Sequence, residues 1–593
     1  MRPLTSLNTW DFVVRFLPVC KFIKKYNGST AICDLVAGIT VGLTLIPQVI
    51  AYASLAGLEP QYGLYSALCG GFVYAVFGTI PELNIAPTAL LSLLTFQYTH
   101  KASFGSVKAA IMLTFFAGIL ELLCGILHLG FLVEFVSTPV VSAFTSAGAI
   151  TIASSQIKNL FGLKYNAESF IEVWKQFFMN LTEIQLWDSL LGFLCIGILL
   201  AMRKLKDYGE PPIANQNQTE KSSVYKKLIW FTSVGRNAMV VVSCAVMAFI
   251  FQYHNQKPFS LTAKVPSGFP NFSLPLEPIE PSNGTNGTEI SEMIGELGCG
   301  IIVIPFVAIL ANVGIAKAFA HGKVVDASQE MIAVGLCNIA GSFFGSYPVN
   351  ASFSRAAVSS ASGVRTPLSG IYTGLMVIMA FTLFTPYFPY IPKATLAAVI
   401  ICAVVFMVET TITKLIWKIN KLDIIPFVAT FISCLIIGIE MGILIGILVE
   451  VCKLIYFTSR PKVLIETIQE TVPYLRVTFS SSIYFSSAEY GRQKILKHCF
   501  NSGQEIHRVL INCINILNLD YTAAKCFESL LKDLQKRGKT VAFLIPNDRI
   551  RKVLEVSCEA KLTVFKSENQ FKLSLQEGNG VNNADFEAVI TQL

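Results

Sequence analysis

Residues 346–355, near the middle of the chain, combine the side chains best suited to hold an anion: SYPVNASFSR. Pro348 disfavours helical geometry at the residue before it. The helix that follows is therefore expected to begin near Asn350 or Ala351. Backbone N–H groups at a helix start lack partners within the helix and lie at the positive end of its dipole. We therefore predict that an anion binds at this helix start.

The same residues have a simpler interpretation as ordinary helix caps. Serine and asparagine side chains commonly accept hydrogen bonds from the first N–H groups of helices in soluble proteins. Arg355 favours a binding site instead, because apolar segments lie on both sides of it. An arginine within a bilayer is costly and marks a site or an ion path by default.

The composition indicates a polytopic α-helical membrane protein. Of 593 residues, 53% are hydrophobic and only 14% are charged, and the mean hydropathy is +0.57. Many windows are long enough to cross roughly 30 Å of hydrocarbon. The net charge of +8 is spread over loops, so it informs topology and gives no reason to expect a nucleic-acid partner.

Charge and glycosylation motifs orient the chain. Residues 1–30 mix aromatic and basic side chains, which is typical of an amphipathic segment on the cytosolic face, and a transmembrane domain is expected over 31–458. The loop between 203 and 236 carries seven Lys or Arg residues and should be cytosolic. The loop 253–293 should lie on the opposite side, because it contains the glycosylation acceptors Asn271, Asn283 and Asn286.

Prolines divide the membrane domain into two similar halves. The first apolar segment of each half contains a proline, Pro47 or Pro305, and the third is a short helix that begins near Pro87 or Ser352. Each half has seven segments, and an odd number places the halves in inverted orientation. We expect repeats at about 31–252 and 294–458, with a site between two facing half-helices.

The composition changes after Arg460, where residues 459–593 are expected to form a cytosolic α/β domain. Residues 474–479, 509–513 and 540–545 resemble short buried strands, and the amphipathic stretch 523–536 lies between the last two. Asp520 is expected to cap that helix. Because Tyr521 and Thr522 follow it, a phosphorylation switch is disfavoured against capping.

Several motifs resemble the sulfate permease (SulP) family of anion transporters. They are PQVIAYASLAGLEPQYGLYS at 47–66, IAPTALLSLL at 85–94 and the SFSR stretch, followed by the α/β domain. KNLFGL at 158–163 and AKAFA at 316–320 are similar to the animal sodium-independent sulfate anion transporter branch. The resemblance implies fourteen segments in two inverted repeats, a core and a gate domain, and a C-terminal STAS domain. It also implies a homodimer.

Family resemblance places the anion between the third and tenth segments, against a wall from the first. Amide, hydroxyl and backbone donors could bind a desolvated oxyanion without a full opposing charge, and Arg355 is expected to supply a background positive field. The substrate-binding residues that the resemblance implies are Gln48, Tyr52, Thr88, Ser352, Phe353, Ser354 and Arg355.

The eighth segment departs from the family pattern. Many sulfate-transporting relatives have a glutamate there, taken to link transport to protons, and Ala311 stands at the matching position. Asn312 and Lys317 remain as residues that could modulate transport. We therefore favour exchange over proton-coupled symport. Two other acids in apolar segments, Glu121 and Glu330, could act as relays, but inward-facing structural hydrogen bonds are the favoured role.

The resemblance therefore implies a sodium-independent exchanger of the sulfate, chloride, bicarbonate and oxalate class, with sulfate as the main substrate, that works by elevator-like alternating access. An anion channel on the same fold, or a membrane scaffold that acts through STAS partners, remain alternatives. An enzyme is disfavoured, because no phosphate-binding glycine loop and no paired metal ligands occur, and no cofactor or metal is expected. Either the plasma membrane or the lysosomal membrane fits, with both termini cytosolic.

Overall fold

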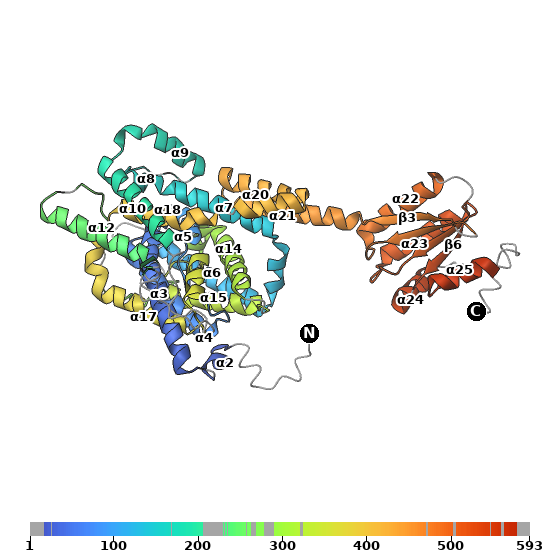
Figure 1. Ribbon diagram of the computed structural model, residues 1–593, viewed down its shortest axis with the longest axis horizontal. Helices are drawn as coiled ribbons and strands as arrows, with labels where there is room; N and C mark the ends of the chain where they lie inside the picture. The colour runs from blue at the N-terminus through green and yellow to red at the C-terminus, as the bar shows by residue number, and fades with distance from the viewer. Residues whose placement is uncertain are drawn as a thin grey trace. The chain divides into compact units, whose positions relative to one another are not determined.

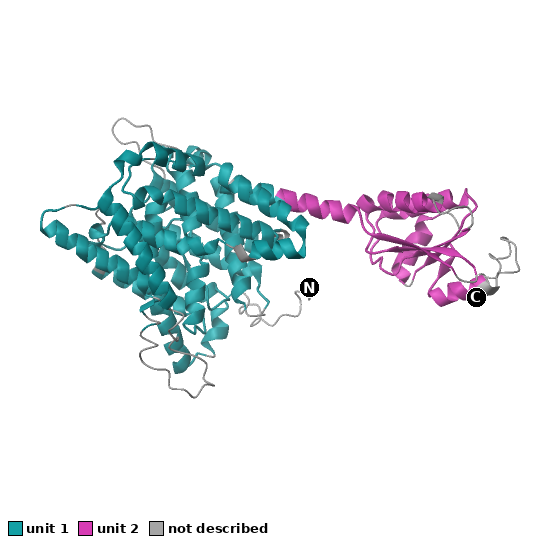
Figure 2. Ribbon diagram, turned by 45° about the horizontal axis from the view of Figure 1, so that its top comes forward, with its two compact units in different colours: residues 1–447 teal, residues 448–593 magenta. Residues whose placement is uncertain are grey.

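The computed structural model describes residues 17–577 with short gaps. The positions not described in that range are 25, 166, 168, 206–228, 230–231, 234, 257, 263–267, 278–289, 321–323, 409, 470–471, 502–505, 546 and 559–561. The chain divides into two compact units, residues 1–447 and 448–593, shown in teal and magenta in Figure 2.

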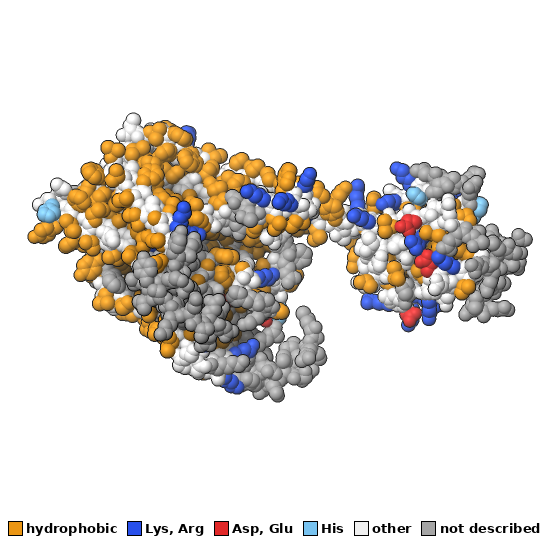
Figure 3. Space-filling view, viewed as in Figure 1, with side chains coloured by type: hydrophobic (Ala, Val, Ile, Leu, Met, Phe, Trp, Pro, Cys, Tyr) orange, Lys and Arg blue, Asp and Glu red, His pale blue; other side chains and the backbone are white. Residues whose placement is uncertain are grey.

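Helices dominate the first unit, and hydrophobic side chains cover much of its visible surface (Figures 1 and 3). Eight helices of the described chain are long and apolar enough to cross a membrane. The first seven segments are α3 (Gly28–Leu55), α4 (Pro60–Phe77), α5 (Ala89–Thr99), α6 (Ser106–Ile126), α7 (Thr138–Ser155), α10 (Leu186–Leu205) and α12 (Arg236–Tyr253).

The second half repeats this order, and its fourth element continues as a short π-helix, η5 (Ala380–Phe384). Its seven segments are α14 (Gly300–Phe319), α15 (Ala327–Ser342), α16 (Phe353–Ala361), α17 (Ser369–Met379), α18 (Lys393–Val404), α20 (Ile424–Ile436) and α21 (Ile439–Ser459). In both halves the third element is short: 11 residues in α5 and nine in α16. A helix of that length cannot span the bilayer alone, so both begin or end within it.

One sequence prediction about this region is wrong. The tenth segment does not begin at Asn350 or Ala351, because these residues form the two-residue strand β2 and the helix begins at Phe353. β2 pairs antiparallel with β1 (Ile85–Ala86), so the backbone stays extended until the pairing ends.

Helices α6 and α15 lie in backbone contact through glycines. A Cβ atom on Gly118 would lie 2.7 Å from the nitrogen of Ile339, and one on Gly335 would lie 2.7 Å from the nitrogen of Leu122. Small residues let transmembrane helices approach this closely without a hydrophobic driving force. This contact fixes α15, whose C-terminal end leads into the 346–355 stretch.

Some predicted features lie outside the described residues. These include residues 1–16 of the amphipathic N-terminus and the acceptors Asn283 and Asn286. Of the N-terminal segment the structure describes α2 (Val19–Ile23), and the third acceptor, Asn271, is exposed.

The second unit contains a five-stranded sheet of order β3-β4-β5-β6-β7. β3 (Val463–Ile468) is antiparallel to β4 (Tyr474–Phe479), and the other pairs are parallel: β5 (Arg508–Asn512), β6 (Thr540–Leu544) and β7 (Val564–Phe565). α22 (Phe485–Asn501), α23 (Tyr521–Gln535) and α24 (Asp548–Ser557) pack on one hydrophobic cluster, and α25 (Glu568–Glu577) packs on another. The predicted strand, helix, strand order is confirmed.

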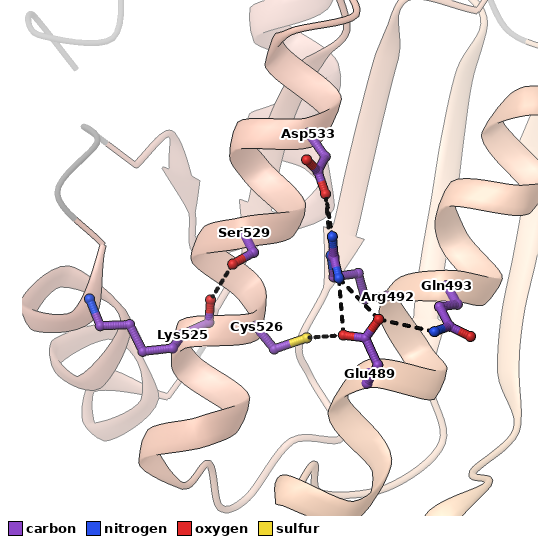
Figure 4. Close-up of polar contacts among 7 residues, drawn as sticks. All are labelled: Glu489, Arg492, Gln493, Lys525, Cys526, Ser529 and Asp533. Carbon is purple, nitrogen blue, oxygen red and sulfur yellow. Dashed lines mark hydrogen bonds and ion pairs between the residues drawn. The ribbon is translucent and has the colours of Figure 1, made fainter.

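Side-chain contacts fix the helices of this domain (Figure 4). Asp520 caps α23 as predicted, because its carboxylate accepts a hydrogen bond from the Ala523 N–H at 2.8 Å. Arg492 on α22 pairs with Asp533 on α23 at 2.7 Å and with Glu489 at 3.0 Å. Burial raises the pKa of the Cys526 thiol to about 11, and the nearby Glu489 adds to the rise, so this thiol stays protonated at neutral pH.

Candidate functional site

The site is built where the starts of two short helices meet. β1 leads into α5 and β2 leads into α16, and the two strands pair through Ile85 with Ala351 and Ala86 with Asn350. The pairing holds two chain segments some 260 residues apart side by side. The N-terminal ends of α5 and α16 therefore lie next to the same small sheet.

Neither helix start is capped by its own side chain. The residues before the helices, Thr88 and Ser352, have extended backbones, and neither side chain bonds to a helical N–H group. The Thr88 hydroxyl donates instead to Asn350 Oδ1 at 2.8 Å, and the Ser352 and Ser354 hydroxyls lie 3.0 Å apart. The capping interpretation therefore fails for Ser352. In both helices the N-cap side chain leaves the first N–H groups to other partners, as an anion site at a helix start requires.

Arg355 ties the two helix starts together. Its side chain is 1% exposed. One terminal nitrogen donates to the Pro87 carbonyl at 2.8 Å, and the other donates to the carbonyls of Ala86 at 3.0 Å and Asn350 at 3.3 Å. Among the described residues its Nε has no hydrogen-bond partner. A full positive charge thus lies beside both helix N-termini, where it adds to the field of the two dipoles.

A cavity of about 870 Å³ reaches this point. α3 supplies Thr44 and Gln48 to its wall, and α16 supplies Ser354 and Arg355. Gln48 is buried, and its Oε1 has no partner within the described part of the chain. Amide and hydroxyl groups therefore face the cavity beside the helix starts, where they can bind an oxyanion.

Cations from two further helices also line the cavity. Arg203 and Lys204 come from the end of α10, and Arg236 comes from the start of α12. Arg203 lies over the ring of Phe406, 3.1 Å from its centroid. The described lining contains no acidic side chain. A cleft lined by one sign of charge concentrates oppositely charged solutes, so the cavity favours anions.

The structure brings together part of the predicted residue set. Gln48, Ser354 and Arg355 line the cavity, whereas Thr88 and Ser352 stand at the helix starts beside it. The other two predicted residues are outside the cavity lining. Tyr52 is buried near Arg355, and the half-exposed ring of Phe353 packs against Phe319 at 5.3 Å.

Asn312 lies in a buried network behind the site. Its amide donates to Glu330 at 3.3 Å, and Glu330 also accepts from the Tyr74 hydroxyl at 2.9 Å and from Thr79. Lys317 lies on the exposed face of α14. Glu330 is therefore hydrogen-bonded to four donor groups, which is the structural role the sequence favoured.

The sequence missed two supports of the site. Asn338 on α15 bonds both the N–H and the carbonyl of Val349, just before β2, and donates to Glu121 at 2.8 Å. Asn350 accepts the Thr88 hydroxyl across the helix starts. The only sign in the sequence was that Asn338 and Asn350 are polar residues within apolar stretches. Their partners are distant in the sequence, so the contacts could not be predicted from it.

Comparison with known proteins gives two family matches. The model of the sulfate permease family matches residues 32–430, and the STAS domain model matches residues 463–576. The chain is 37% identical over 545 residues to the sodium-independent sulfate anion transporter of Bos taurus, which covers 91% of this chain and 88% of that protein. It is 30% identical to the chloroplastic sulfate transporter 4.1 of Arabidopsis thaliana, over 91% of this chain and 78% of that protein.

Solved structures share the fold. The overall structure of SLC26A9 superposes with a TM-score of 0.80 at 19% identity, over 98% of this chain and 95% of that one. The transmembrane domain of the cyanobacterial bicarbonate transporter BicA superposes with a TM-score of 0.55 at 17% identity, over 72% of this chain and 98% of that one. The helical membrane unit followed by a STAS domain is therefore a known architecture.

The bond between Thr88 and Asn350 should matter for anion affinity. Thr88→Val keeps the shape but removes the donor, and a net hydrogen bond is worth about 1 kcal/mol, so we expect roughly five-fold weaker anion binding. Thr88→Ser keeps the hydroxyl and serves as the matched control. Calorimetric titration of the purified chain with sulfate measures the effect; equal affinities of the two variants would contradict the assigned role.

The cations at the cavity mouth should speed anion entry. Lys204→Gln removes one charge from the lining, and we expect flux at low ionic strength to fall about two- to five-fold, with the difference shrinking in high salt because exposed charges are screened. Lys418→Gln removes the same charge from an exposed position of α19 (Thr410–Ile419), outside the cavity lining. A matching loss of flux in both variants would assign the effect to net charge alone.

Proposed function

Because the chain belongs to the sulfate permease family of anion transporters, we propose that it exchanges small inorganic anions across a membrane, with sulfate as the main substrate. Chloride, bicarbonate or oxalate would be the counter-anions. One observation carries the proposal: the uncapped start of α16 and a buried arginine meet at a cavity whose described lining has cations but no acid. The uncapped start of α5 is held beside them by the pairing of β1 with β2.

The donors at the site suit a weakly held oxyanion. Gln48 and Ser354 are neutral, and the backbone N–H groups carry only partial charge. The hydrogen bonds of Arg355 to four backbone carbonyls occupy much of its guanidinium, so it acts mainly through its field. A carrier must release its ion on the far side, and neutral donors with one background charge allow this release.

The lack of a carboxylate at position 311 of α14, the eighth segment, favours exchange without proton coupling. Ala311 offers no proton acceptor, and Asn312 beside it is bonded to Glu330. Four donors already surround Glu330, which leaves that carboxylate little room to act as a relay. We therefore assign Asn312 and Lys317 a modulating role at most.

Alternating access would move one group of helices past another. In this proposal α5 and α16 form the mobile core together with α3 and α14, which contact both, and with α4, α6, α15 and α17, which pack on these helices in turn. α7, α10, α18 and α20 form the gate. The end of α10 and the start of α12 line the cavity, and the segment that joins these two helices in the sequence is basic, which predicts a cytosolic position. The described conformation would therefore face inward.

The remaining assignments rest on the family resemblance and on charge. We propose domains at 1–30, 31–458 and 459–593, cytosolic termini, a glycosylated outer loop at 253–293 and a homodimer in the plasma or lysosomal membrane. The exposed position of Asn271 is compatible with glycosylation. Cytosolic partners would bind through the STAS domain.

Labelled sulfate uptake into proteoliposomes tests this function. Uptake should require chloride or oxalate inside the vesicles, ignore a pH gradient, and fall at least ten-fold in Ser354→Ala and Arg355→Gln. Uptake that both variants leave unchanged would contradict a site at the start of α16. Uptake driven by a pH gradient without a counter-anion would contradict exchange, and conductance far above carrier turnover would assign a channel.

A further inference from the structure

A second concave surface lies on another face of α3 from the anion cavity. It is a groove of about 480 Å³ whose lining exposes no polar atom. The α3 residues that line the groove are Leu43, Ile46, Pro47 and Ile50, whereas Thr44 and Gln48 line the anion cavity. α3 therefore separates a polar cavity from an apolar groove.

The opposite wall of the groove is a continuous apolar stripe on α12. Its members recur at helical spacing: Ala238, Val241, Val242, Ala245, Val246 and Phe249. At 1.5 Å per residue this stripe is about 16 Å long. The hydrocarbon core of a bilayer is roughly 30 Å thick, so the groove extends across about one leaflet.

The groove is open on the exposed face of α12. The side chains of Val242 and Val246 are 60% and 53% exposed, and the described lining exposes no polar atom to the groove. α12 is long and apolar enough to cross a membrane, where such a surface is surrounded by hydrocarbon.

The length of the groove and the residues at its end favour a lipid chain over a further helix. The apolar stripe is about as long as the hydrocarbon of one leaflet, which is the reach of a single acyl chain. At one end the groove is bordered by η6 (Thr385–Tyr390), where Tyr387 is exposed and Tyr390 packs against Phe249 at 5.0 Å. Tyrosines favour the level of lipid headgroups.

We propose that one acyl chain of a bilayer phospholipid occupies this groove and sets the position of α3 during transport. Pro47 has no N–H group, so the Leu43 carbonyl lacks its usual helical partner and α3 is easily bent at this level. Gln48 follows Pro47 directly. An acyl chain in the groove would lie between α12 on one side and α3 with α17 on the other. By pressing on α3 it would displace Gln48 in the wall of the anion cavity.

Native mass spectrometry of the full detergent-purified chain, titrated with palmitoyl-oleoyl phosphatidylcholine, tests the binding. Ala245→Trp fills the groove and should retain one phospholipid fewer than the unmodified chain. Leu194→Trp places the same ring at an exposed position of α10 outside the groove lining and should retain the full number. Ala245→Leu, a milder change, should show an intermediate loss and decides the matter if the tryptophan variant does not fold.

Equal phospholipid retention in all four proteins would overturn the site, and so would cholesterol replacing phospholipid in mixed micelles. The link to α3 is tested by anion flux in proteoliposomes, which should change at least three-fold in Ala245→Trp relative to Leu194→Trp. Unchanged flux after loss of the lipid would overturn that link. The retention measurement needs no transported anion, so its outcome is independent of the function proposed above.

Discussion

The buried guanidinium of Arg355 holds together the two helix starts on which the site depends. β1 and β2 contribute only two residue pairs, and so short a ladder has little stability of its own. Arg355 adds hydrogen bonds to carbonyls on both strand exits, at Pro87 and Asn350. A buried charge without such partners would be strongly destabilising, so the carbonyls stabilise the arginine as much as it stabilises them.

This arrangement separates the fixed charge from the groups that face the cavity. The arginine lies against carbonyls, while Ser354 and Gln48 line the cavity at the uncapped start of α16, beside the uncapped start of α5. An anion there would feel one full charge and two dipoles but would bond mainly to neutral donors. Behind the site, Asn338 and Glu330 bind the surrounding helices to one another through buried hydrogen bonds.

The sequence predicted the parts of the fold that have strong local signals. The short α5 was expected from Pro87 and its brief apolar run, and the strands and cap of the STAS domain were expected from hydrophobic patterning and Asp520. The pairing of β1 with β2 could not be predicted, because two-residue strands have no periodicity and their partners lie some 260 residues apart. The same pairing explains why α16 begins at Phe353 and not at Asn350.

The roles of individual side chains were harder to predict from the sequence than the positions of helices and strands. Arg203, Lys204 and Arg236 were interpreted as markers of a cytosolic loop, since a basic residue at a helix end has the same sequence signature whether it faces water or a cavity. Arg355 was expected to act as a background charge, but its carbonyl partners on the first half of the chain could be found only in three dimensions.

The central claim is that the anion binds between the starts of α5 and α16. Anomalous diffraction from crystals grown with selenate, a heavier analogue of sulfate, would test it most directly. The account predicts a selenium peak within hydrogen-bonding reach of the Ser354 backbone N–H and the Gln48 amide. A peak confined to Arg203, Lys204 and Arg236, with none at the helix starts, would contradict it.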